Sequence, residues 1–363
     1  MRHPVVFAPV VVVWLLAAVT DALGAVPLLG FLVAVVGGLV VWRRRNSESF
    51  TRHVSWRVRG LWRGRWTYRF AWQPAMVTTG LAVSLGSREY LPKIRTVRST
   101  GTVDRVRVRM LPGQTLEDWA TAAPRLAQTF DAQECRVLSI HGSRQELLLW
   151  FLVHDPLTHP IDPLAPRPGR EGAAVDLTAL PVARREDGLD YRLRLLGTHL
   201  LIVGATGSGK GSVIWSLIHA LQPAIKDKTV EVWALDPKGG MELAPGRALF
   251  ARFVYGDPDN DEDGNPAHNR ADGRADGTAY ELDFARVLED AVMVMRRRQA
   301  ALRGVTRLHT PSVAEPLVVV VVDELASLTA YVQDREAKKR IVAALSLLMS
   351  QGRAVGVTLV GAV

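Results

Sequence analysis

The chain has 363 residues, of which 48% are hydrophobic, and it carries a formal net charge of +9 with a pI near 10.0. This length allows a large buried core together with a smaller second domain. The single cysteine, Cys135, excludes an internal disulfide and a cysteine-based metal cluster. The positive charge suits a nucleic acid or an anionic membrane surface equally well.

Residues 1–45 predict a membrane anchor. Residues 5–19 are apolar, two polar residues interrupt the run, and residues 22–42 then carry no charge over 21 positions, which is the length of one bilayer-spanning helix. Arg2 precedes the first run and Arg43–Arg45 follow the second, so both ends are expected in the cytosol. The pattern favours a two-helix hairpin over a cleavable signal sequence with one spanning helix, because no Ala-x-Ala site follows the first run. Both arrangements predict a cell-membrane protein, multi-pass in the first case, whose later residues lie in the cytoplasm.

Residues 46–100 form a basic and aromatic segment beside the expected anchor. Between Arg43 and Arg69, nine arginines accompany one acidic residue, Glu48. The interleaved aromatic residues are Trp56, Trp62, Trp66, Tyr68 and Trp72. Arginine and tryptophan next to a spanning helix favour contact with membrane lipids. Contact with DNA, on which tryptophans can stack, and contact with other proteins remain alternatives.

Residues 101–155 predict a small α+β domain. Residues 103–110 alternate charged and apolar side chains, as a half-buried strand does. Thr115 and Asp118 have the spacing of a capping box that opens a helix to about Phe130. Two more strands are expected at residues 136–141 and 146–153. Five prolines then mark residues 156–190 as a stiff linker, so the small domain is expected to act in spacing or ring assembly.

A phosphate-binding loop follows the apolar run that begins at Leu200. Gly204, Gly209 and Lys210 have the spacing G-x-x-x-x-G-K, between a predicted strand and a predicted helix. Glycines let several backbone N–H groups point at one phosphate, and Lys210 is expected to reach the β- and γ-phosphates. The residues expected to contact the nucleotide are Gly204, Ala205, Thr206, Gly207, Ser208, Gly209, Lys210, Gly211 and Ser212.

The loop departs from the usual pattern at one position. The residue after Lys210 is normally Ser or Thr, whose hydroxyl holds Mg²⁺, but here it is Gly211. Either Ser212 supplies the hydroxyl through an altered helix start, or water replaces it. A third interpretation is a protein that binds ATP and hydrolyses it poorly.

The second half of an ATPase site is predicted at residues 317–324. Leu317–Val322 is an unbroken run of the kind found in a parallel strand buried on both faces. Asp323 and Glu324 follow at its carboxyl end, as in a Walker B motif. Asp323 is expected to hold the metal, and Glu324 to act with Lys210 in catalysis by polarising the attacking water.

Several motifs in one order resemble the motor domain of FtsK/SpoIIIE-type DNA translocases. They are GATGSGK (204–210), DPKGGMEL (236–243), MRRRQAAL (295–302), VVVDELASL and SQGRAVGVTLVGAV (350–363). The chain is particularly similar to membrane-anchored versions on actinobacterial conjugative elements. The resemblance implies a RecA-like α/β ATPase over residues 191–363, using ATP and Mg²⁺ and assembling as a ring, expected to be hexameric, on double-stranded DNA. It also implies that further strands follow Val363, so the parallel sheet is expected to be incomplete at its C-terminal side and this form to be weakly active.

The sequence therefore predicts a membrane-anchored, ATP-driven DNA translocase in plasmid conjugation or chromosome handling. A type VII-like protein-secretion ATPase and a nucleotide-binding membrane scaffold with little turnover are the alternatives.

Overall fold

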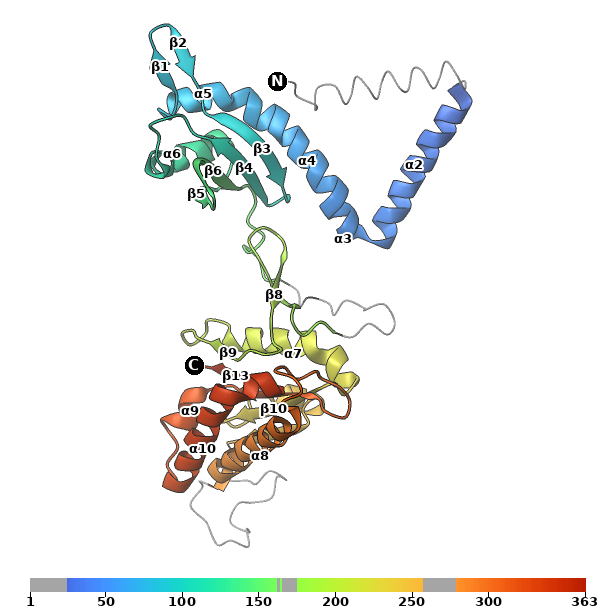
Figure 1. The fold of residues 1–363 in the computed structure, drawn as a ribbon, viewed down its shortest axis with the longest axis vertical. Helices are drawn as coiled ribbons and strands as arrows, with labels where there is room; N and C mark the ends of the chain where they lie inside the picture. The colour runs from blue at the N-terminus through green and yellow to red at the C-terminus, as the bar shows by residue number, and fades with distance from the viewer. Residues whose placement is uncertain (1–24, 162–163, 165–174, 257–278) are drawn as a thin grey trace. The chain divides into compact units, whose positions relative to one another are not determined.

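The computed structural model describes residues 25–161, 164, 175–256 and 279–363, so the first apolar run at residues 5–19 lies outside it. The chain divides into two compact units (Figure 1). The first runs to Thr158 and also includes Glu186–Gly188, and the second comprises His159–Arg185 and Leu189–Val363.

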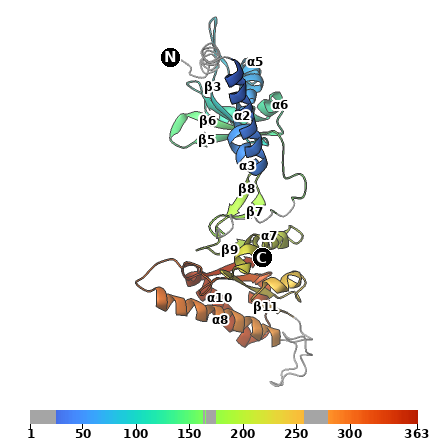
Figure 2. The ribbon, with the colours of Figure 1, turned by 90° about the vertical axis from the view of Figure 1, so that its right-hand side faces the viewer.

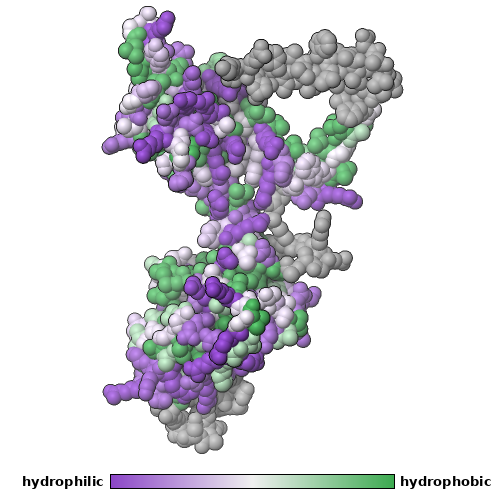
Figure 3. All heavy atoms as spheres, in the orientation of Figure 1, coloured by the Kyte–Doolittle hydropathy of each residue, from purple (hydrophilic) through white to green (hydrophobic). Residues whose placement is uncertain are grey.

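Unit 1 begins with a series of helices. They are α2 (Ala25–Arg45), α3 (Ser47–Phe50), η1 (Thr51–Ser55), α4 (Trp56–Arg63), η2 (Gly64–Arg69) and α5 (Phe70–Thr78). Figure 3 shows hydrophobic residues along α2, which ends in three arginines. In the stretch of chain that the structure covers, no helix combines the length and the apolar character that a bilayer crossing requires. The structure therefore gives no support to a spanning helix at residues 25–45, and the first predicted run lies outside the described residues.

A four-stranded antiparallel sheet forms the body of unit 1, in the order β3-β4-β6-β5. The elements after α5 are β1 (Val83–Leu85), β2 (Arg88–Tyr90), β3 (Lys93–Ser99), β4 (Val103–Arg109), α6 (Leu116–Thr129), β5 (Glu134–Ile140) and β6 (Ser143–Leu152). The predicted capping box is confirmed: Asp118 N–H donates to Thr115 Oγ1 at 3.3 Å and Thr115 N–H to Asp118 Oδ2 at 2.7 Å. The small domain begins earlier than expected, because β3 lies in the segment that was predicted to be juxtamembrane.

Two glycines let the helical segment α4–η2 lie directly on β3. A Cβ on Gly60 would come within 3.3 Å of the Val97 carbonyl oxygen, and one on Gly64 within 3.3 Å of Val97 Cβ. Tyr68 and Trp72 continue this face at four-residue spacing and are buried in the core of unit 1. The expectation that these two aromatic residues contact lipid or DNA is therefore wrong.

Unit 2 contains a five-stranded parallel sheet in the order β11-β10-β12-β13-β9. Its strands are β9 (Leu200–Ile202), β10 (Val230–Asp236), β11 (Arg252–Tyr255), β12 (Leu317–Val322) and β13 (Val357–Ala362). Before them, β7 (Leu180–Arg184) and β8 (Asp190–Leu193) form an antiparallel pair. The linker predicted over residues 156–190 is therefore too long, since β7 is a regular strand within it.

Helices cover both faces of this sheet, with α7 on one side and α8 and α10 on the other (Figures 1 and 2). The helical elements of unit 2 are α7 (Lys210–Lys226), η3 (Ala244–Leu249), α8 (Ala279–Leu302), α9 (Leu325–Thr329), α10 (Arg335–Leu347), η5 (Leu348–Gly352) and η6 (Arg353–Val355). Alternate residues of β12 enter the two separate apolar cores: Val318 and Val320 pack with α8 and α10, and Val319 packs with α7. A strand buried on both faces explains the unbroken apolar run in the sequence.

Candidate functional site

The glycine-rich loop joins β9 to α7 in the predicted manner. Gly207 and Gly209 have φ of 77° and 89°, in the left-handed region that favours glycine. α7 begins at Lys210 with Gly209 as its N-cap, so the free N–H groups of its first turn lie at the loop. Lys210 Nζ donates to the Gly204 carbonyl oxygen at 2.7 Å, which holds the ammonium group over the loop. This is the arrangement of backbone and charge that binds a polyphosphate.

The acidic pair follows β12, two strands away from β9 in the sheet. The N–H of Asp323 donates to the Leu235 carbonyl oxygen at 3.2 Å, so the turn after β12 stays beside β10. Only 4% of Asp323 is exposed. Burial raises the pKa of Asp323, opposed by the nearby Lys238 ammonium and reinforced by the charges of Asp236 and Glu242.

Asp236, at the end of β10, organises the segment that follows it. The carboxylate is fully buried and accepts three backbone N–H groups, from Lys238 at 3.0 Å, Glu242 at 3.1 Å and Leu243 at 3.0 Å. Hydrogen bonds to a carboxylate are stronger than those between neutral groups. Asp236 thus fixes the turn that carries Lys238 and Glu242.

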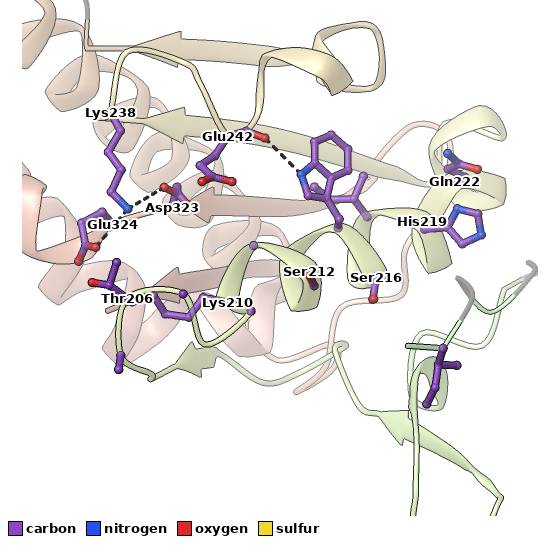
Figure 4. A pocket seen from close by; sticks show the side chains of 17 residues that line it. Thr206, Lys210, Ser212, Ser216, His219, Gln222, Lys238, Glu242, Asp323 and Glu324 are labelled. Atoms are coloured by element: carbon purple, nitrogen blue, oxygen red, sulfur yellow. Dashed lines mark hydrogen bonds and ion pairs between the residues drawn. The ribbon is translucent and has the colours of Figure 1, made fainter. Parts of the chain in front are cut away.

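Lys238 links this turn to the acidic pair. Its Nζ lies 3.2 Å from Asp323 Oδ2 and 3.4 Å from Glu324 Oε2 (Figure 4). Burial alone would lower the pKa of Lys238, but the two carboxylates outweigh burial and raise it. The DPKGGMEL motif contains Lys238 and Glu242, but neither residue was predicted to have a role in the site. The position of that motif at a strand's carboxyl end was the available signal.

One cavity of about 940 Å³ brings these groups together. Its walls come from the glycine loop and α7, from the turn after β10, and from the end of β12 (Figure 4). The predicted site residues that line it are Ala205, Thr206, Gly207, Gly209, Lys210, Gly211, Ser212, Asp323 and Glu324. Gly204 takes part through its carbonyl oxygen, and Ser208 N–H donates to the Ala205 carbonyl oxygen at 3.1 Å within the loop.

The donor groups of this cavity fit a magnesium ion that arrives with a nucleotide. Asp323 Oδ2 is buried, and it faces the Lys238 ammonium as an ion pair at 3.2 Å. Among the residues placed by the structure, no three His, Cys, Asp or Glu side chains form a cluster that could hold a metal. Magnesium is commonly held by one or two carboxylates plus substrate phosphates and water, which needs no such cluster.

Two known protein families match separate parts of this chain, and one match includes part of the cavity. Residues 40–150 match the actinomycete conjugal transfer protein N-terminal domain, and residues 173–249 match the FtsK/SpoIIIE family. The resemblance inferred from the motifs is therefore confirmed. The second match includes the glycine loop and the turn after β10, whereas Asp323 and Glu324 lie beyond it.

Individual proteins are similar to parts of this chain. Transfer protein TraSA of Streptomyces ambofaciens is 29% identical over 288 residues, which cover 74% of this chain and 60% of that protein. This chain thus spans less than two thirds of that relative's length. The pCW3 conjugation coupling protein TcpA, solved with ATPγS, is 18% identical with a TM-score of 0.42, covering 81% of this chain and 76% of its own. EssC (ATPases 2 and 3) from Geobacillus thermodenitrificans is 16% identical with a TM-score of 0.36, covering 56% and 36%.

Proposed function

We propose, from the FtsK/SpoIIIE match of residues 173–249 and from the cavity, that this chain is an ATP-driven motor that moves double-stranded DNA during conjugative transfer. The observation that carries the proposal is the meeting of Lys210 with Asp323 and Glu324 around one cavity. ATP hydrolysis needs a cationic group beside the phosphates and a carboxylate beside the attacking water, on opposite sides of the phosphate that is transferred. The conjugal transfer match of residues 40–150 supports DNA as the cargo.

The residues divide the work of hydrolysis between them. Lys210 and the N–H groups at the start of α7 bind and orient the phosphates. Bound Mg²⁺ would neutralise developing phosphate charge, and Asp323 would hold it. Glu324 orients the attacking water and takes its proton. For that step Glu324 must separate from Lys238, whose ammonium now lies 3.4 Å from its carboxylate.

DNA-stimulated ATP hydrolysis tests this proposal. We expect linear double-stranded DNA to raise the turnover of the purified chain several-fold, and an unfolded polypeptide at equal mass to leave it unchanged. Stimulation by polypeptide alone would favour a secretion ATPase. ATP binding without turnover under any condition would favour a scaffold. Native mass of the DNA-bound protein tests the proposed hexameric ring.

We also propose that unit 1 associates with the surface of an anionic membrane. Trp62, Trp66 and Phe70 follow at four-residue spacing and are 60%, 62% and 81% exposed. Each of them follows a residue of the buried face (Gly60, Gly64 or Tyr68) by two positions, which is about half a helical turn. They therefore occupy the side of the helical segment that faces away from β3. Arg65 and Arg69 beside them are exposed, and their charge suits anionic headgroups.

Vesicle binding tests this exposed aromatic face. We expect Trp62→Ser combined with Trp66→Ser to weaken binding to phosphatidylserine vesicles about tenfold or more, because two large apolar side chains are lost. Tyr331→Ser removes an aromatic residue that is 74% exposed in unit 2 and should change nothing. If the double variant binds vesicles normally but loses DNA retardation in a gel, the face contacts nucleic acid instead.

A further inference from the structure

The position after Lys210 is already faced by another side chain. A Cβ on Gly211 would come within 3.1 Å of Glu242 Oε2, a distance tighter than ordinary packing. The carboxylate of Glu242 therefore lies beside residue 211, where a serine or threonine side chain of the usual motif would begin. In P-loop ATPases the hydroxyl at this position contacts the magnesium ion.

The backbone of Glu242 is fixed while its side chain stays free. Its N–H donates to Asp236 Oδ2 at 3.1 Å, and its carbonyl oxygen accepts from Trp215 Nε1 at 3.2 Å. Within the described residues the Glu242 carboxylate makes no hydrogen bond or ion pair. It lines the cavity together with Asp323 (Figure 4). Glu242 thus has a fixed backbone and an exposed carboxylate that has no partner among the described residues.

Ser212 is the competing donor, and the helix geometry does not favour it. α7 begins regularly at Lys210, so no altered helix start brings Ser212 into position 211. Consecutive residues of an α-helix point about 100° apart. In Figure 4 Ser212 lies on the side of Ser216, away from the acidic pair.

We propose that Glu242 replaces the missing hydroxyl, so that Glu242 and Asp323 together hold the magnesium ion of bound Mg-ATP. This inference rests on the proposed ATPase function and assigns its metal ligands. Hard carboxylate oxygens are the ligands that magnesium takes from proteins, and two carboxylates plus phosphates and water complete its shell. Gly211 leaves room for the Glu242 carboxylate, and a larger residue at position 211 would displace that carboxylate.

Equilibrium binding of fluorescent mant-ATP, without turnover, provides the test. The affinity of the whole chain for mant-ATP is measured in EDTA and across a titration of Mg²⁺. The affinity in Mg²⁺ divided by the affinity in EDTA reports the contribution of the metal. We expect Glu242→Gln to lower this ratio about tenfold or more, a loss that even outer ligands of metal sites produce. Affinity in EDTA should stay at the wild-type value or rise, because a negative charge is removed near the phosphates.

Two further variants serve as controls. Ser212→Ala should keep the wild-type ratio. Gly211→Ser combined with Glu242→Gln should recover much of the lost ratio, because the hydroxyl returns to its usual position and the side chain that faces it no longer carries a charge. Circular dichroism of each variant checks that the fold is retained.

The outcomes separate this inference from the function on which it rests. A wild-type ratio in Glu242→Gln, or a loss in Ser212→Ala instead, overturns the role of Glu242 while leaving the ATPase intact. Wild-type protein that binds no mant-ATP with or without Mg²⁺ overturns the proposed function and this inference with it.

Discussion

Replacing Glu324 by Gln should leave ATP binding nearly unchanged and lower kcat by about 10²–10⁴-fold, the usual contribution of a general base. The amide keeps the size of the side chain but can neither take a proton from water nor pair with the Lys238 ammonium at 3.4 Å. Because the carboxylate is needed on the attacking water and not on the bound phosphates, its loss affects the transition state selectively. Steady-state ATPase and equilibrium mant-ATP binding measure the two effects separately.

The control for this variant is Glu336→Gln, which neutralises an exposed carboxylate on α10. It should hydrolyse ATP at the wild-type rate. Turnover of Glu324→Gln close to wild type would show that Glu324 is not the general base and that another residue of the cavity takes this role.

The parallel sheet of unit 2 was predictable because its sequence signals are local. Leu317–Val322 reads as one buried strand and is β12 with the same bounds. The glycine loop and the acidic pair each follow a strand, and the carboxyl ends of parallel strands meet at one edge of a sheet. Their convergence on one cavity follows from that rule.

Unit 1 was predicted less well because its signals are mixed with charge. β3 carries Lys93, Arg95 and Arg98, and most of its residues are exposed, so its alternation is hard to recognise. Tyr68 and Trp72 belong to the core, whereas Trp62 and Trp66 are exposed, yet all four lie in one arginine-rich run. The buried side of the helix is the one on which Gly60 and Gly64 approach β3, and this approach is visible only in the structure.

The roles of Lys238 and Glu242 could not be read from the sequence either. Lys238 meets Asp323 because β10 and β12 are neighbours, although the two residues are 85 positions apart. The placement of the Glu242 carboxylate beside residue 211 depends on the turn that Asp236 holds, so it can be recognised only in three dimensions.

Replacing Lys210 by Ala should weaken ATP binding by about 2–5 kcal/mol, the cost of removing one partner of a close charge pair. The effect should appear in EDTA as well as in Mg²⁺, because the ammonium group contacts the phosphates directly. Among the described residues, Lys210 Nζ makes one hydrogen bond, to the Gly204 carbonyl oxygen. Its loss should therefore lower the free energy of unfolding by only about 1 kcal/mol.

Lys226→Ala is the matched control, since Lys226 is an exposed lysine in the last turn of the same helix, α7. It removes an equal charge far from the glycine loop and should bind ATP as the wild type does. Mant-ATP affinity together with chemical denaturation distinguishes a lost phosphate contact from a damaged fold. If Lys210→Ala keeps its ATP affinity in EDTA and in Mg²⁺, the phosphates are held by the loop and the α7 N–H groups alone. The Lys210 ammonium then serves only to hold the Gly204 carbonyl group through its hydrogen bond.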